Sequence, residues 1–102
     1  IGICYEVIKP EYRELVKERV ERFHDVIEIK KEQLLNFCGN CLEIPDKDGN
    51  LLLAMSTAAF NAYTELQKEK IEKHFKKIVH TDISTIEKYG GGSARCMLAE
   101  LF

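Results

Sequence analysis

A strand-like stretch, a helix-like stretch and a glycine follow one another twice in this chain of 102 residues. Residues 26–39 (VIEIKKEQLLNFCG) match residues 78–91 (IVHTDISTIEKYGG) when the two segments are offset by 52 positions. Repeats that join strands to helices are typical of α/β proteins in which neighbouring copies cover each other's sheets. The repeat therefore predicts an α/β fold built from similar modules.

Periodicity and turn residues place the other elements around this repeat. Alternating or apolar runs predict strands over 3–8, 25–29, 40–44, 78–80 and 94–102. Helical spacing predicts helices over 10–23, 31–36 and 84–89, and a capping box at Thr64 to Gln67 starts another. The turn-rich segment 45–50 (PDKDGN) predicts a hairpin between Leu42 and Met55, and Ser56 can cap the helical turns after it. Both ends of the chain lie inside apolar runs, so we expect the C-terminal part of a longer domain.

Charge and cysteine content limit the classes of partner. Lys and Arg number 15 and Asp and Glu number 17, a net charge of −2, whereas nucleic acids and acidic membranes are bound by basic surfaces. No apolar run approaches the roughly 18 residues that a membrane span needs. Without a secretion signal, the four cysteines are expected to be reduced thiols in a cytoplasmic protein.

The most unusual segment is 89–97 (YGGGSARCM). Three successive glycines allow backbone conformations with positive φ and close approach of a ligand, and they lead to Cys96 at the start of the predicted last strand. Arg95 or backbone N–H groups could favour the thiolate of Cys96, which is the nucleophilic form. The alternative is a flexible GGGS turn followed by an inert core cysteine.

The segment GGGSARCM, with the LAELF that follows it, resembles the C-terminal motif of the guanidine-modifying pentein superfamily. This superfamily includes arginine deiminases, agmatine deiminases, dimethylarginine dimethylaminohydrolases and amidinotransferases, and the resemblance is closest to bacterial amidinotransferase-type proteins linked to citrulline use. Residues 37–42 (FCGNCL) resemble the segment before the final βαβ unit of these enzymes. The resemblance implies one domain over 1–102, with two ββαβ modules (about 1–50 and 51–102) of a five-module pentein α/β propeller.

The resemblance also implies a chemistry. Cys96 would attack the guanidinium carbon of arginine or a related compound, and water or an amine would then take the amidino group from the sulfur, as in a hydrolase or an amidinotransferase. Asn40, Gly91, Gly92 and Arg95 are the implied substrate-binding residues, and no metal or cofactor is implied. The partner is a small guanidino molecule. The histidine and most carboxylates would come from preceding modules or a second copy, so the segment alone is expected to be inactive.

The remaining candidates have simpler explanations. His24 and His74 lie on predicted helices and are expected to be structural, whereas His80 ends a strand and could approach the site. Glu87 and Glu100, the carboxylates nearest Cys96 in sequence, are expected to be structural or at the surface.

Two other functions stay open on the sequence. One is a pentein-fold binding protein with a vestigial site. The other is a thiol–disulfide protein that uses Cys38 and Cys41, a C-x-x-C pair that has no second pair with which to bind zinc.

Overall fold

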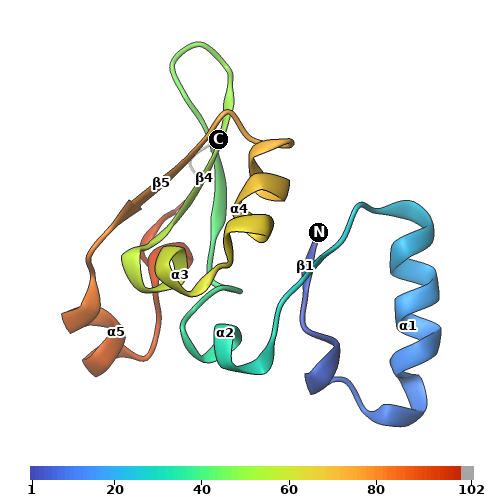
Figure 1. Cartoon of the computed structure of the whole chain (residues 1–102). Coiled ribbons are helices and arrows are strands. Elements are labelled where there is room, and N and C mark those ends of the chain that lie inside the picture. The colour runs from blue at the N-terminus through green and yellow to red at the C-terminus, as the bar shows by residue number, and fades with distance from the viewer. Residues whose placement is uncertain (100–102) are drawn as a thin grey trace.

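Helices and two small sheets alternate along the chain in the computed structural model, which describes residues 1–99 (Figure 1). The N-terminal elements are β1 (Gly2–Ile3), a 3-10 turn (Tyr5–Val7), α1 (Pro10–Phe23), β2 (Ile27–Glu28) and α2 (Lys31–Leu35). The C-terminal elements are β3 (Leu42–Pro45), β4 (Leu51–Ser56), α3 (Thr57–Ala62), α4 (Glu65–Glu72), β5 (Lys77–Thr81), α5 (Ser84–Gly90) and α6 (Ala94–Met97). The α/β class expected from the sequence is confirmed.

The larger sheet has the strand order β3-β4-β5. β3 is antiparallel to β4 and β5 is parallel to it, so Leu53 lies opposite Glu43 on one side and Ile78 on the other. At the turn between β3 and β4, the Asp46 carboxylate accepts the N–H groups of Asp48 and Asn50 at 2.8 and 2.9 Å. The predicted hairpin is confirmed. The hairpin spans residue 50, which is the expected boundary between the two modules. β3 therefore lies in the same sheet as β4 and β5, which follow it in the chain.

Side-chain caps start the two helices that connect β4 to β5. The Ser56 hydroxyl accepts the Ala59 N–H at 3.1 Å, and the Thr64 hydroxyl accepts the Gln67 N–H at 3.2 Å. The Gln67 side chain accepts the Thr64 N–H in return, at 2.8 Å, which completes the capping box that the sequence predicts. These caps hold the crossover that the parallel pair β4–β5 requires.

The core lies where this crossover packs on the sheet. Met55 of β4 and Ile71 of α4 are each 2% exposed, and Ala59 of α3 is fully buried. Tyr63, between α3 and α4, donates its hydroxyl to the backbone oxygen of Cys38 at 2.6 Å. This bond fixes the segment that leads from α2 into β3 against the core.

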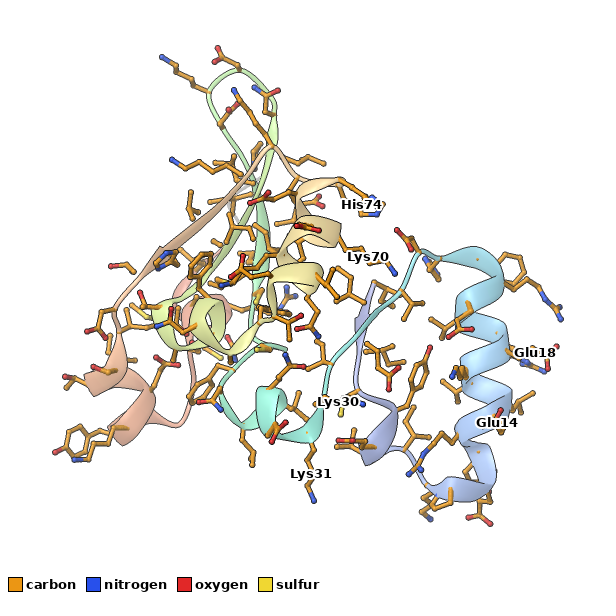
Figure 2. All side chains as sticks on the ribbon, viewed as in Figure 1. Glu14, Glu18, Lys30, Lys31, Lys70 and His74 are labelled. Carbon is orange, nitrogen blue, oxygen red and sulfur yellow. The ribbon has the colours of Figure 1, made fainter. Side chains whose placement is uncertain are left out.

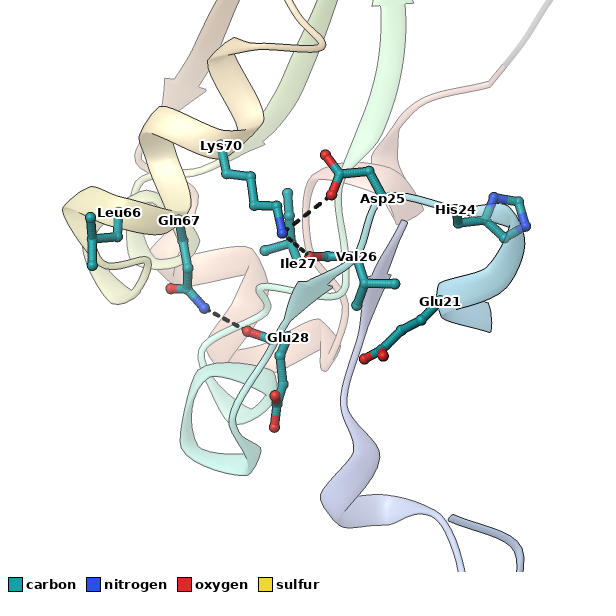
Figure 3. A pocket seen from close by; sticks show the side chains of 9 residues that line it. All are labelled: Glu21, His24, Asp25, Val26, Ile27, Glu28, Leu66, Gln67 and Lys70. Atoms are coloured by element: carbon teal, nitrogen blue, oxygen red, sulfur yellow. Dashed lines mark hydrogen bonds and ion pairs between the residues drawn. The ribbon is translucent and has the colours of Figure 1, made fainter. Parts of the chain in front are cut away.

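The N-terminal elements are joined to α4 through the segment between α1 and β2. Asp25 accepts a 2.7 Å hydrogen bond from His74 and lies 3.3 Å from the Lys70 ammonium. Lys70 of α4 and His74, just after the end of α4, both reach toward this segment (Figure 2). The Gln67 amide also donates to the backbone oxygen of Glu28 at 2.7 Å, beside an open pocket of about 490 Å³ (Figure 3). Polar contacts therefore make up much of this junction.

Three expectations need correction. The predicted strand 3–8 is reduced to β1, because its parallel partner β2 ends after two residues, where the chain turns into α2. The predicted strand 94–102 is wrong for residues 94–97, which form α6, and residues 100–102 lie outside the described part. The helix over 10–23 is confirmed. Its apolar side is less covered than expected, since Tyr12 and Leu15 are 54% and 49% exposed, and Figure 1 shows α1 beyond β1, away from the larger sheet.

Among residues 1–99, no helix combines the length and the apolar character that crossing a membrane requires.

Substitution of Met55 by Ala is expected to lower the free energy of unfolding by about 2–5 kcal/mol, because it leaves a cavity in the core. Substitution of Leu66, which lies on α4 and is 78% exposed, by Ala is the control and should change it by no more than about 0.5 kcal/mol. Urea denaturation followed by circular dichroism measures both. Equal losses for the two variants would contradict the assigned core.

The junction should also be sensitive to acid. Hydrogen bonds from His74 and Lys70 lower the pKa of the Asp25 carboxyl, against a smaller opposing effect of burial. A carboxyl whose pKa is lower when folded stabilises the protein above its unfolded pKa of about 3.9 and loses this effect as the pH falls through its folded pKa. Asp25→Asn should therefore lower the urea midpoint at pH 7, and the gap to the wild type should close below about pH 4.

Because Asp25 is half exposed, this effect is expected to be small. The control is Asp48→Asn, since the Asp48 carboxylate has no hydrogen bond or ion pair with the described residues. A gap for Asp25→Asn that stays constant down to pH 3 would contradict the assignment.

Candidate active site

The three glycines form the connection between α5 and α6. Gly90 ends α5, and Gly91 adopts a left-handed conformation with φ of 71°. At Gly92 a Cβ atom would lie 3.0 Å from both Cβ and Sγ of Cys96, closer than most Cβ contacts in proteins. Gly92 therefore leaves space beside the sulfur, and Gly91 allows the direction of the turn.

Cys96 lies on the surface, in the one-turn helix α6 rather than at the start of a strand. Its N–H donates to the backbone oxygen of Ser93 at 3.0 Å, which closes this turn. The exposed position does not fit an inert core cysteine. It leaves the sulfur accessible to a small molecule.

Asn40 reaches the sulfur from a segment 56 positions earlier in the sequence. Its side-chain Nδ2 donates to Sγ of Cys96 at 3.2 Å, and its Oδ1 accepts the Arg95 N–H at 2.9 Å. The structure thus brings together the two segments on which the resemblance rests, residues 37–42 and 90–97. Asn40 contacts the candidate nucleophile itself, a contact that the sequence does not predict.

These contacts change the acidity of the thiol. The hydrogen bond from Asn40 has the largest effect and lowers the pKa of Cys96, and a backbone hydrogen bond at Ser93 lowers it further. Burial opposes these two by a smaller effect, and the positive charge of Arg95 lowers the pKa by the least. Donors and positive charges stabilise the thiolate, which is the reactive form. These contacts therefore favour the thiolate form of an exposed sulfur.

The thiols of the C-x-x-C pair, Cys38 and Cys41, have raised rather than lowered pKa values. Burial raises the pKa of Cys38 to about 12 and that of Cys41 to about 11. Cys38 donates weakly to the Ala59 backbone oxygen at 3.5 Å, inside the core. Reactive redox pairs need a thiol of lowered pKa, so this geometry does not favour a thiol–disulfide function.

Within residues 1–99 there is no group of three or more His, Cys, Asp or Glu side chains placed to hold a metal ion.

Two of the three histidines have side-chain partners of their own. His74 pairs with Asp25, whereas His24 follows α1 and its backbone N–H donates to the Val20 backbone oxygen. His80 lies 2.9 Å from the Thr57 hydroxyl through Nδ1, and its ring stacks on Phe60. Among the hydrogen bonds of the described residues, none joins a histidine to Cys96. His80 does, however, line an apolar hollow that adjoins α6.

An apolar hollow of about 300 Å³ adjoins α6 on the side of the larger sheet. Ala94, Met97 and Leu98 line it from α6 and the residue after it, Met55 and Val79 come from the sheet, and His80 of β5 also lines it. Among the described residues, no carboxylate lines it. Glu87 is buried rather than at the surface and contacts Ser56 and Ser93, while Glu100 lies outside the described residues. Sequence reasoning missed Ser93, whose only signal is its place directly after the glycines.

Substitution of Gly92 by Ala should displace Cys96 and slow its reaction with iodoacetamide at pH 7, because the added methyl group would overlap the sulfur. Gly90→Ala is the matched control, since a Cβ there would lie 3.9 Å from the nearest atom of Ile86, an ordinary contact. Mass spectrometry of the alkylated peptide gives both rates. Equal rates for the two variants would contradict the close approach at Gly92.

Substitution of Asn40 by Ala should raise the pKa of Cys96, because it removes the largest stabilising contact of the thiolate. The pH dependence of alkylation should move to higher pH. Asn36→Ala is the control, because the Asn36 amide donates only to the Glu32 backbone oxygen on the surface. An unchanged pH profile in Asn40→Ala would show that Asn40 does not affect the sulfur.

Comparison with protein families gives a match that extends over the whole chain. The model of the family described as "N,N dimethylarginine dimethylhydrolase, eukaryotic" matches residues 1–102. No curated protein and no solved structure matches the chain. The match confirms the resemblance to the guanidine-modifying pentein superfamily, whereas a closer likeness to bacterial amidinotransferase-type proteins stays a prediction. The chain belongs to the eukaryotic N,N dimethylarginine dimethylhydrolase family.

Proposed function

We propose that this chain supplies Cys96 as the nucleophile of a hydrolase that cleaves a guanidino C–N bond of a methylated arginine. The observation that carries the proposal is the 3.2 Å contact from Asn40 Nδ2 to the exposed Sγ, on a thiol whose pKa is lowered. The family match supplies the reaction class, because its description names a dimethylarginine hydrolase.

The reaction divides into two displacements at the guanidinium carbon. The thiolate forms a C–S bond with this planar, electron-poor carbon, and the C–N bond to the dimethylamino group breaks as that group leaves with a proton. Water then adds to the amidino-thioether carbon and the C–S bond breaks. The products are citrulline and dimethylamine, and the thiolate is restored. The leaving amine takes its proton from an acidic group of the protein; the water later returns one proton to that group and releases its second proton to the medium.

The residues around the sulfur fit a role in binding as well. Gly92 lies beside Cys96 and the exposed Arg95 precedes it in the chain, and we assign both, with Gly91 and Asn40, to the substrate site. Carboxylates that grip a guanidinium by paired hydrogen bonds, and a histidine that moves protons, are assigned to other residues of the protein or to a second copy. The substrate is a small guanidino compound, and no cofactor is required.

The direct test is an assay of the complete protein that contains this sequence, with N,N-dimethylarginine as substrate and citrulline as the measured product. Cys96→Ser should abolish turnover, because a hydroxyl is a far weaker nucleophile than a thiolate near neutral pH. The control is Cys41→Ser, because the half-buried Cys41 thiol has its pKa raised to about 11. This control should keep its activity.

The outcomes separate the alternatives. Citrulline formation that persists in Cys96→Ser would refute the nucleophile. Product that appears only when an acceptor amine is added, with the amidino group on that amine, would show an amidinotransferase. Saturable binding of dimethylarginine without any product in the wild type would show a binding protein with a vestigial site.

A further inference from the structure

Glu87 is a buried carboxylate close to the glycine connection. It lies on α5 and is 8% exposed. Its Oε2 accepts two hydroxyl hydrogen bonds, from Ser93 at 3.1 Å and from Ser56 at 3.2 Å, and both serines are fully buried. Within residues 1–99, no ion pair includes Glu87. Because a buried carboxylate needs its hydrogen bonds, these two donors are well fixed.

The Ser93 side of this arrangement leads to the sulfur. Ser93 follows Gly92 directly, and the Ser93 backbone oxygen accepts the Cys96 N–H at 3.0 Å. The bond from Ser93 to Glu87 spans six positions and therefore closes the glycine connection into a loop. Since glycines do not restrict their own backbone, an anchor after them is what can fix the direction in which α6 begins.

The second serine, Ser56, links Glu87 to a part of the structure other than the sulfur. Ser56 ends β4, and its hydroxyl also caps α3 through the Ala59 N–H at 3.1 Å. One carboxylate oxygen thus connects the central strand of the larger sheet to the residue that starts α6. Ser56 therefore holds the carboxylate from the side of the sheet, whereas the bond from Ser93 to Glu87 of α5 closes the glycine loop without Ser56.

We propose that Glu87 is a positioning residue for Cys96, which acts through Ser93 to fix the glycine connection and hold Sγ beside Asn40. Glu87 touches neither the sulfur nor Asn40 among the described contacts, so its effect is on placement. The inference rests on the proposed function for its importance in turnover, but it makes a claim about the thiol that can be measured without turnover.

The experiment follows the reaction of Cys96 with iodoacetamide against pH in the full chain, with the alkylated cysteine identified by mass spectrometry. Ser93→Ala removes one hydroxyl from the Glu87 carboxylate on the side of the sulfur. Ser56→Ala is the matched control, because it removes the other hydroxyl from the same oxygen, on the side of β4 and α3. Glu87→Gln keeps the size and an acceptor oxygen, whereas Glu87→Ala removes both.

In Ser93→Ala and Glu87→Ala we expect the pH profile to move to higher pH and the rate at pH 7 to fall by about threefold or more, since less thiolate is present below the thiol pKa. In Ser56→Ala the profile should stay at the wild-type position, although the urea midpoint falls because a helix cap is lost. Glu87→Gln should recover most of the wild-type profile. This rescue distinguishes placement by hydrogen bonding from an effect of the charge.

A wild-type pH profile in Ser93→Ala would overturn the inference, even if Glu87→Ala does not fold. An equal shift in Ser56→Ala and Ser93→Ala would also overturn it, because it would show a general loosening of the structure. Either result leaves the nucleophile proposal standing, since that proposal is tested by the turnover of the wild type and of Cys96→Ser.

Discussion

The hydrogen bond between Asn40 and the sulfur of Cys96 is the interaction on which this account of the site depends. One amide side chain donates to Sγ and accepts the Arg95 N–H, so it positions the sulfur and stabilises its charge at the same time. The turn that contains Asn40 is itself held by the core, because Tyr63 donates to the Cys38 backbone oxygen two positions earlier. The site is thus a surface feature whose geometry originates in buried contacts.

Four thiols in one chain show how burial and hydrogen bonding separate chemical roles. Cys38 and Cys41 lie where burial disfavours charge, and their pKa values rise to about 12 and 11. Cys96 lies outside the core beside donors and a positive charge, and its pKa falls. For Cys38 and Cys41, the cost of removing a charge from water raises the pKa. For Cys96, the favourable contacts lower it. Only the second environment suits a nucleophile.

Local signals predict local structure well in this chain. The hairpin, the helix that begins at Pro10 and the capping box at Thr64 follow from turn residues, spacing and caps a few positions apart. The strand expected over 94–102 fails, since the apolar composition of that segment does not reveal that Ser93 and Asn40 fix its first residues in a helical turn. The contacts of Asn40 with Cys96 and of Glu87 with Ser56 join distant positions and have no local signature, although the motif itself pointed to Cys96.

The central claim, that the fold activates Cys96 and protects the other thiols, is tested most directly by the alkylation rates of all four cysteines of the unaltered protein as a function of pH. The account predicts that Cys96 reacts first, and that its rate levels off at a lower pH than that of an unstructured cysteine peptide. A Cys96 that reacts no faster than Cys41, or with the profile of the free peptide, would contradict it.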